Sequence, residues 1–211
     1  MKNTKQKIIE TGLTMSKKNL TIETWGNLSC IDKDGNIYIT PSGMPYDTLQ
    51  ENDICILDTS GKQIGGKRKP SIESMLHVLI YQNRKDVHAI IHTHAIASTI
   101  FATLHKPIPV ITDEMAQSIG GTVECAKYAL PGTLDLAKNV VAALDNKQAV
   151  LMSNHGAVCV GKDFTECLKV ASVLESCADI YQKALTIGTP IKISTENTLW
   201  MRDFALHKYG Q

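Results

Sequence analysis

Short apolar segments alternate with helical patterns along this chain, and that alternation limits the possible folds more than any other feature. Strands are predicted at residues 36–40, 53–58, 87–92, 148–153 and 156–160, and helices at residues 8–18, 71–83, 95–104 and 164–186. Several strands border short turns such as Ser60-Gly61, which favours hairpins over long crossovers. The sequence therefore predicts an α/β fold with a mixed or antiparallel sheet and helices on its faces.

Composition and charge indicate one globular domain that does not bind nucleic acid. The chain has 211 residues, of which 43% are hydrophobic and 20% charged, and its formal net charge is +1. A chain of this length can bury a full core as one domain, and no internal repeat or long linker divides it. We therefore predict a single domain over residues 1–211. Near-neutrality argues against a polyanion partner, because nucleic-acid-binding proteins usually carry a basic excess.

No stretch of the sequence is apolar enough to predict a membrane span. The most apolar stretch, residues 89–104, is interrupted by His92 and His94 and falls short of the roughly 18 uninterrupted apolar residues that a span requires. The start, MKNTKQKIIETG, has a basic tip but lacks the apolar core of a signal peptide. The six cysteines form no C-x-x-C pair, which favours free thiols in a reducing compartment. We therefore expect a cytoplasmic protein with no membrane partner.

The strongest chemical signal is the segment His92-Thr93-His94, at the end of a predicted strand. Residues i and i+2 of a strand point to the same side, so both imidazoles face one direction. Two imidazoles on one face suit a divalent transition metal such as zinc. The alternative is a pair of hydrogen-bonded histidines in a polar pocket, which is the commoner reading of an isolated pair.

His155 lies between two apolar strand-like segments, directly before Gly156, which permits a tight bend. Such a bend can aim the ring into a cleft, and a third imidazole would complete the three-ligand pattern of catalytic zinc. The alternative is an ordinary turn histidine.

Glu73 is the candidate acid/base, near the start of a predicted helix. The alternative is that a carboxylate in the first helical turn is simply favoured by the helix dipole. His77 lies one turn further on, which allows an i,i+4 contact with Glu73. Two glycine-containing segments rich in small and hydroxyl residues, together with Ser71 at the helix start, suit a phosphate, although each alone is typical of an ordinary turn. The candidates in these segments are Gly26, Asn27, Ser42, Gly43 and Ser71.

Taken in order, these motifs resemble the class II aldolase/adducin-head family, over about residues 8–209. The pattern is closest to that of the fuculose-phosphate aldolases of the family, and the segment Thr24-Trp25-Gly26-Asn27 is similar to its 4-epimerases. The resemblance implies a three-layer α/β/α sandwich around a central, largely antiparallel mixed sheet. It also implies a homotetramer with sites between subunits.

The resemblance also implies roles for individual residues. His92, His94 and His155 take the place of the ligands of a divalent metal, with zinc expected ahead of manganese or cobalt. Glu73 takes the place of the catalytic acid/base, and Tyr209 resembles a catalytic tyrosine near the C-terminus. The residues matching the phosphate-binding positions are Gly26, Asn27, Ser42, Gly43 and Ser71.

The chain departs from the family pattern at two places. Ile72 stands where the family usually has a second serine, which removes one hydroxyl from the expected phosphate cradle. The segment Ile111 to Gln117, which we expect to set the specificity for the aldehyde half of the substrate, also differs. Asp113 replaces a tyrosine of the aldolase pattern, and Gln117 replaces a catalytic aspartate of the epimerase pattern.

The activity implied is retro-aldol cleavage of a phosphorylated ketose, like fuculose 1-phosphate, to dihydroxyacetone phosphate and an aldehyde. The same chemistry in a pentulose-5-phosphate 4-epimerase is the first alternative, and a related decarboxylase is another. A non-catalytic binding head is disfavoured, because that branch of the family is expected to lack the metal histidines.

Overall fold

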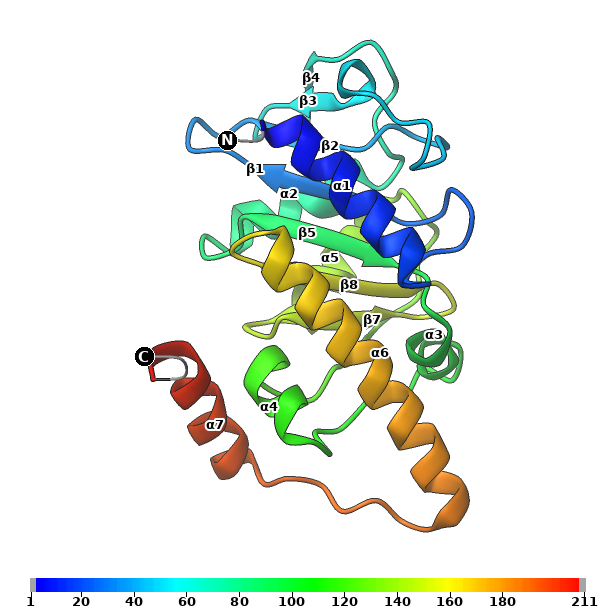
Figure 1. The fold of residues 1–211 in the computed structure, drawn as a ribbon, viewed down its shortest axis with the longest axis vertical. Helices are drawn as coiled ribbons and strands as arrows, with labels where there is room; N and C mark the ends of the chain where they lie inside the picture. Colours follow the sequence, from blue (N-terminus) through cyan, green and yellow to red (C-terminus); the bar gives the residue numbers. More distant parts are fainter. Residues whose placement is uncertain (1–2, 209–211) are drawn as a thin grey trace.

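One eight-stranded sheet organises residues 3–208, the part of the chain that the structure, a computed structural model, describes (Figure 1). The order across the sheet is β4-β3-β2-β1-β5-β8-β7-β6. Neighbouring strands are antiparallel except for the pair β6 and β7, which is parallel. The strands are β1 (Asn27–Ile31), β2 (Ile37–Ile39), β3 (Cys55–Leu57), β4 (Gln63–Gly65), β5 (Ala89–Thr93), β6 (Cys125–Ala126), β7 (Ala149–Met152) and β8 (Gly156–Gly161).

Helices cover both faces of this sheet. In Figure 1, α1 and α6 cross in front of the sheet, and α2 and α5 lie behind it. Residues of α3 and α4 pack into the same core as those of α1 and α6. The C-terminal helix α7 follows an extended segment and docks on α4, where the Arg202 guanidinium donates to the Gln117 carbonyl oxygen over 2.7 Å. The helices are α1 (Thr4–Lys17), α2 (Ser74–Asn83), α3 (Ile96–Thr103), α4 (Asp113–Ile119), α5 (Leu134–Leu144), α6 (Phe164–Ile187) and α7 (Thr195–His207), with a 3-10 turn at Glu51–Asp53.

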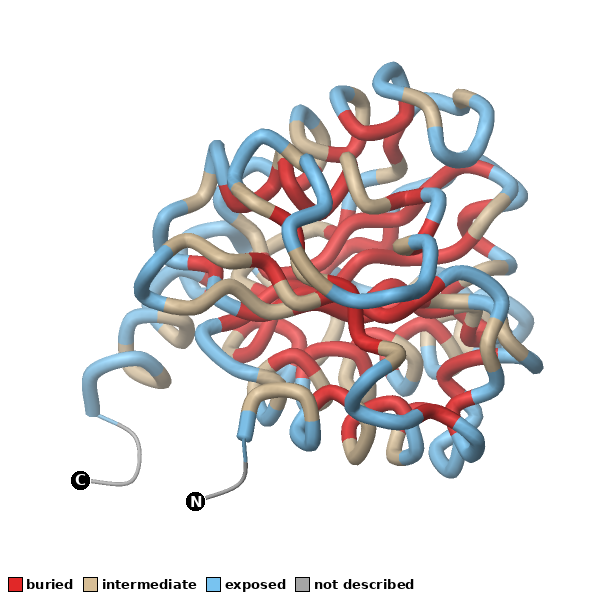
Figure 2. Tube along the Cα trace, turned by 90° about the horizontal axis from the view of Figure 1, so that it is seen from above, coloured by how far each residue is buried: buried red, intermediate tan, exposed pale blue. Residues whose placement is uncertain are grey.

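Successive residues of the central strands feed two separate cores, one on each face of the sheet. On β5, Ile91 packs into the core under α1 and α6, while Ile90 packs into the core under α2 and α5. Both side chains are fully buried. Seen from above, the buried strands form a band between two helical layers whose outer surfaces are exposed (Figure 2). The predicted three-layer α/β/α sandwich with a largely antiparallel sheet is therefore confirmed.

The fold also corrects the element predictions. The helix expected at 71–83 begins at Ser74, and three helices and three strands were missed: α4, α5, α7, β1, β4 and β6. The most consequential omission is β1, because its Asn27-Leu28-Ser29 sequence is typical of a turn. It nevertheless pairs with both β2 and β5 at the centre of the sheet. Its polar side chains are buried there because they have partners on α2.

All six cysteines are free, and four of them are buried. Among the described residues, no helix combines the length and apolar character needed to cross a bilayer.

Candidate active site

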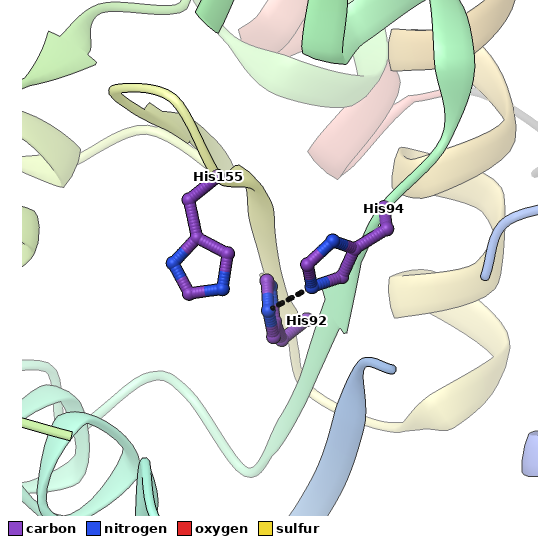
Figure 3. Close-up of side chains that lie close together, drawn as sticks. All are labelled: His92, His94 and His155. Carbon is purple, nitrogen blue, oxygen red and sulfur yellow. Dashed lines mark hydrogen bonds between the residues drawn. The ribbon is translucent and has the colours of Figure 1, made fainter. Parts of the chain in front are cut away.

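Three histidines converge at the end of β5 (Figure 3). His92 is on β5, His94 follows the strand directly, and His155 lies in the turn between β7 and β8. These segments meet because β5 pairs antiparallel with β8, with His92 opposite Val158. The ring centroids are 4.6 to 5.0 Å apart, and one potential ligand atom from each ring lies within 4.8 Å of the others. The structure therefore brings together the three residues predicted as metal ligands.

The protonation of these rings suits metal binding. Burial, reinforced by the neighbouring imidazoles, lowers the pKa of His94 to about 3 and that of His155 to about 4. Both rings are thus neutral near pH 7, the form in which histidine binds a metal. His92 Nδ1 donates to the Ala157 carbonyl oxygen over 3.0 Å. This bond orients the ring so that its other nitrogen, Nε2, lies 2.9 Å from His94 Nε2.

The turn that carries His155 differs from the predicted one. The His155 amide donates to the Met152 carbonyl oxygen over 3.0 Å. The left-handed residue of this turn is Asn154, at φ +56°, and not Gly156. Gly156 is required for another reason: a Cβ there would lie 2.2 Å from the Thr93 carbonyl oxygen. The glycine lets β8 approach β5 closely enough for His155 to join the cluster.

Glu73 faces the same cluster. Its Oε2 lies 3.3 Å from His92 Nε2, and its Oε1 lies 3.6 Å from His155 Nε2. Asn27 Nδ2 donates to Oε2 over 2.9 Å. Burial raises the pKa of the Glu73 carboxyl, but the imidazoles of His92 and His155 and the amide of Asn27 outweigh burial and bring it below its usual value. The carboxyl is therefore ionised at neutral pH although it is buried.

The interpretation of Glu73 as a carboxylate in a first helical turn is wrong. Glu73 occupies the position before the first residue of α2, and its side chain makes no capping hydrogen bond. The Glu73 amide is held by Ser71 Oγ, which accepts from it at 3.3 Å. The side chain is thus turned away from the helix and toward the histidines.

Two buried polar atoms at this site have no hydrogen-bond partner among the described residues: Glu73 Oε1 and His155 Nδ1. Leaving such an atom unsatisfied costs about 1–3 kcal/mol, and more for a charged group. Three imidazoles beside a carboxylate are the donor set that suits zinc and related ions. These residues fit a divalent metal ion.

A cleft of about 540 Å³ opens beside the histidines. Its walls come from segments that are far apart in the sequence, at residues 24–27, 41–43, 71–73, 94, 131 and 154–155. The Ser42 amide donates to the Lys69 carbonyl oxygen, which fastens the second segment to the chain just before the third. Gly26 has φ +86°, and a Cβ there would lie 2.7 Å from the His92 carbonyl oxygen. The structure thus gathers every predicted anion-binding residue in one cleft. The lining includes Gly26, Asn27, Ser42, Gly43, Ser71, Ile72, Glu73, His94 and His155.

Not every predicted site residue is in this cleft. Tyr209 lies outside the described residues. The segment Ile111 to Gln117, expected to determine specificity, contributes no residue to the lining of the cleft in the described chain. Most of this segment instead belongs to α4, which packs against α7 through Arg202. Ile72, which replaces the expected serine, is at the cleft with 65% of its surface exposed.

Sequence reasoning also missed how His77 and Trp25 relate to the site. His77 makes no direct hydrogen bond or ion pair with Glu73; its Nε2 contacts Asn27 Oδ1 at 2.5 Å. Asn27 therefore bridges the two side chains. The Trp25 ring lies beside His94, with ring centroids 5.7 Å apart and planes tilted by 41°, and it lines the cleft. A strand prediction for residues 27–31 would have indicated that Asn27 and Ser29 share one face.

Comparison with known proteins agrees with this geometry. The sequence model of the family described as Class II Aldolase and Adducin N-terminal domain matches residues 6–182. An L-fuculose phosphate aldolase from Escherichia coli O6:H1 is 36% identical over 194 residues, which span 92% of this chain and 89% of the relative. A 5-deoxy-D-ribulose 1-phosphate aldolase from Bacillus thuringiensis serovar kurstaki is 33% identical over 98% of this chain and 97% of its own. A solved structure of an L-fuculose 1-phosphate aldolase superimposes with a TM-score of 0.93 at 34% identity, covering 96% of this chain and 97% of that one.

Proposed function

We propose, because the chain belongs to the class II aldolase and adducin N-terminal domain family, that it cleaves a phosphorylated ketose by a retro-aldol reaction. As a class II aldolase it is a carbon–carbon lyase that depends on a metal. The proposed substrate resembles L-fuculose 1-phosphate, and the proposed products are dihydroxyacetone phosphate and an aldehyde. One observation carries the proposal: Glu73 lies between the histidine cluster and the cleft built from the anion-binding loops.

His92, His94 and His155 are the proposed metal ligands. Zinc is the proposed ion because three imidazoles and a carboxylate suit it, and manganese or cobalt would also be accepted. When bound, the ion supplies positive charge that stabilises the negative charge developing on substrate oxygens during cleavage. No lysine is needed to form a Schiff base with the ketose.

Gly26, Asn27, Ser42, Gly43 and Ser71 are the proposed phosphate-binding residues. Positive φ at Gly26 and Gly43 turns the backbone so that peptide groups border the cleft. The Asn27 side chain is already bonded to Glu73 and His77, so its contribution to the phosphate comes from the main chain. A few amides and hydroxyls suffice for one phosphate, which is consistent with the small net charge of the chain.

Glu73 is the proposed acid/base that moves a proton at the carbon of dihydroxyacetone phosphate. Its Oε1 has no hydrogen-bond partner among residues 3–208, so this oxygen is available for that proton. Tyr209 is proposed to handle the proton on the aldehyde side. That tyrosine belongs to the C-terminal segment beyond the described chain.

The proposal is tested by incubating metal-loaded protein with ketose 1-phosphates, including L-fuculose 1-phosphate and 5-deoxyribulose 1-phosphate. We expect equal amounts of dihydroxyacetone phosphate and aldehyde from at least one of them. Conversion of L-ribulose 5-phosphate to its epimer without free aldehyde would identify a 4-epimerase instead. Release of carbon dioxide from a phosphorylated keto acid would identify a decarboxylase.

We further propose that residues 1–211 form one domain and assemble as a homotetramer in the cytoplasm. Exposed apolar side chains at four-residue intervals along α3 and at its C-cap support assembly: Ile96, Ile100 and Leu104 are 68%, 37% and 56% exposed. Six free cysteines suit a reducing compartment. Light scattering at micromolar concentration should give four times the mass of the chain, and a monomeric mass would contradict the assembly.

A further inference from the structure

A chain of four hydrogen-bonding contacts leads from the interior of the protein to Glu73. It begins at Tyr81, whose hydroxyl lies 2.8 Å from Ser29 Oγ, and Ser29 Oγ lies 2.6 Å from His77 Nδ1. It continues from His77 Nε2 to Asn27 Oδ1 over 2.5 Å, and from Asn27 Nδ2 to Glu73 Oε2 over 2.9 Å. The proposed reaction involves none of the three residues farthest from Glu73, which are Tyr81, Ser29 and His77.

The geometry of two elements builds this chain. Asn27 and Ser29 are two residues apart on β1, so their side chains share one face of the strand. His77 and Tyr81 are four residues apart on α2, so their side chains share one face of the helix. All four are buried, with Ser29 and His77 fully inaccessible. The Ser29 and His77 side chains can therefore find hydrogen-bond partners only among the other members of this series of contacts.

The ionised carboxylate fixes the direction of every hydrogen bond. A carboxylate only accepts, so the Asn27 amide nitrogen donates to it and the Asn27 carbonyl oxygen faces His77. That oxygen can only accept, so His77 carries its proton on Nε2. Burial lowers the pKa of His77 to about 3, so the ring holds a single proton and Nδ1 accepts from Ser29. The Ser29 hydroxyl has one proton, which it donates to His77, so its oxygen accepts the proton of the Tyr81 hydroxyl. Burial raises the pKa of Tyr81, so that hydroxyl keeps its proton.

We propose that Tyr81, Ser29 and His77 are positioning residues whose one-directional hydrogen-bond chain holds the Asn27 amide as a donor to Glu73 Oε2. Hydrogen bonds aligned in one direction polarise one another, which strengthens the last bond of the chain. Oε2 is thereby anchored, and Oε1 is left as the oxygen that exchanges a proton with the substrate. The catalytic part of this inference rests on the proposed function, whereas the arrangement of protons does not.

The catalytic part is tested with His77→Leu, His77→Gln and Tyr81→Phe, using deuterium exchange into dihydroxyacetone phosphate as the readout for Glu73. His77→Leu should lower kcat for exchange roughly 10- to 100-fold, with KM and bound metal unchanged. His77→Gln, whose amide can both donate and accept, should recover much of that loss. Tyr81→Phe removes only the most distant bond and should lower kcat about 2- to 5-fold.

Tyr46→Phe is the matched control for Tyr81→Phe. Both tyrosines are about 95% buried, but the Tyr46 hydroxyl has no hydrogen-bond partner among the described residues. Its removal should leave kcat unchanged. Equal kcat values in wild type, His77→Leu and Tyr81→Phe would overturn the proposal, as would equal losses in Tyr46→Phe and Tyr81→Phe. A loss in His77→Leu that appears entirely in KM would also overturn it.

The proton arrangement is tested without any activity by ¹⁵N NMR of the histidine rings. The His77 signal, identified by its loss in His77→Gln, should report a proton on Nε2 and none on Nδ1 at neutral pH. A proton on Nδ1 would overturn the proposal. If the wild type turns over no ketose phosphate and catalyses no exchange, the proposed function fails, and the NMR result alone decides whether the chain of bonds is as described.

Discussion

The two sides of the Glu73 carboxylate differ in how their polar atoms are satisfied. On the outer side, toward the histidine cluster, Glu73 Oε1 and His155 Nδ1 have no hydrogen-bond partner in the described chain. On the inner side, each polar side-chain atom from Asn27 to Tyr81 has a partner within 2.9 Å. The two unpartnered atoms are themselves buried, although the His155 side chain is 15% exposed, so direct contact with bulk solvent does not explain the difference.

This difference indicates that one side of Glu73 binds ligands and that the other side holds the carboxylate in place. Buried polar atoms in folded proteins are nearly always paired, so two unpaired ones in one place indicate a position for a ligand. A fully paired network with a fixed direction leaves no room for a ligand and instead holds its last member in place. The outer side therefore suits a metal and a substrate, and the inner side suits orientation of the carboxylate.

The largest effect is expected from a change on the outer side, His94→Ala. Loss of one metal ligand should reduce bound zinc and lower the rate of aldehyde release roughly 10⁴-fold, because stabilisation worth several kcal/mol is lost. Elemental analysis and the aldehyde assay together check this. The control is His88→Ala, since His88 is an exposed histidine on the same chain segment outside the cleft. Wild-type activity in His94→Ala would show that the histidine cluster is not needed for catalysis.

Glu73→Gln removes the proposed acid/base itself and should have the second largest effect. Proton exchange at the carbon of dihydroxyacetone phosphate should fall about 10³-fold, within the range of general acid–base catalysis. The exposed Glu124 provides the control variant Glu124→Gln. Retention of full exchange by Glu73→Gln would mean that another group moves the proton.

Acidification should destabilise the metal-free protein, because buried histidines on both sides of Glu73 take up protons only when the protein unfolds. Burial lowers the pKa of His77 to about 3 and of His155 to about 4, whereas in the unfolded chain it is about 6.5. Below pH 6.5 the unfolded state therefore binds protons that the folded state does not. The free energy of unfolding should fall by about 1.4 kcal/mol per pH unit for each such histidine as the pH drops from 6.5 toward 4.

Urea unfolding of metal-free protein at several pH values between 7.5 and 5.0 measures this slope. Glu73 adds little in that range, because a carboxylate with a lowered pKa loses its contribution only nearer its unfolded pKa of about 4.3. His77→Leu should make the slope shallower by about one proton. If the slope of the free energy of unfolding against pH is the same in His77→Leu as in the wild type, His77 does not take up a proton on unfolding. That result would contradict a neutral, fully hydrogen-bonded His77 on the inner side of Glu73.

The smallest effect is expected at the rim of the cleft, from Ile72→Ser. The new hydroxyl restores a donor beside Ser71, and one hydrogen bond should lower KM for a phosphorylated ketose about 2- to 10-fold with kcat unchanged. Ile64→Ser is the control, because Ile64 is similarly exposed, at 54%, on the edge strand β4. An unchanged KM would place the phosphate away from residue 72.

The outer side of the site could be predicted from the sequence, because its signals are local. His92 and His94 share a face by strand alternation, and the motif around His155 is short. The fold class followed from strong periodic segments such as the helix over 164–186, observed as α6 at Phe164–Ile187. The single bend at residue 155 was assigned to Gly156 because glycine is the usual left-handed residue, whereas Asn154 adopts that conformation.

The inner side could not be predicted, because it depends on pairing between distant segments. Asn27 and His77 are 50 residues apart, and Ser29 and Tyr81 are 52 apart. Small polar residues in β1 are typical of turns, so the strand that carries half of the network was missed. Only the register of β1 against β5, with Asn27 opposite His92, places those residues behind the carboxylate.

We propose that the protein cleaves a phosphorylated ketose in the cleft beside Glu73, with a metal held by the histidine cluster. The most direct test is the stoichiometry of products from L-fuculose 1-phosphate, measured before metal removal, after verified removal and after zinc is restored. We predict one dihydroxyacetone phosphate per aldehyde in the loaded protein, neither product after removal, and recovery with zinc. Full product formation by protein shown to be free of metal would contradict the account.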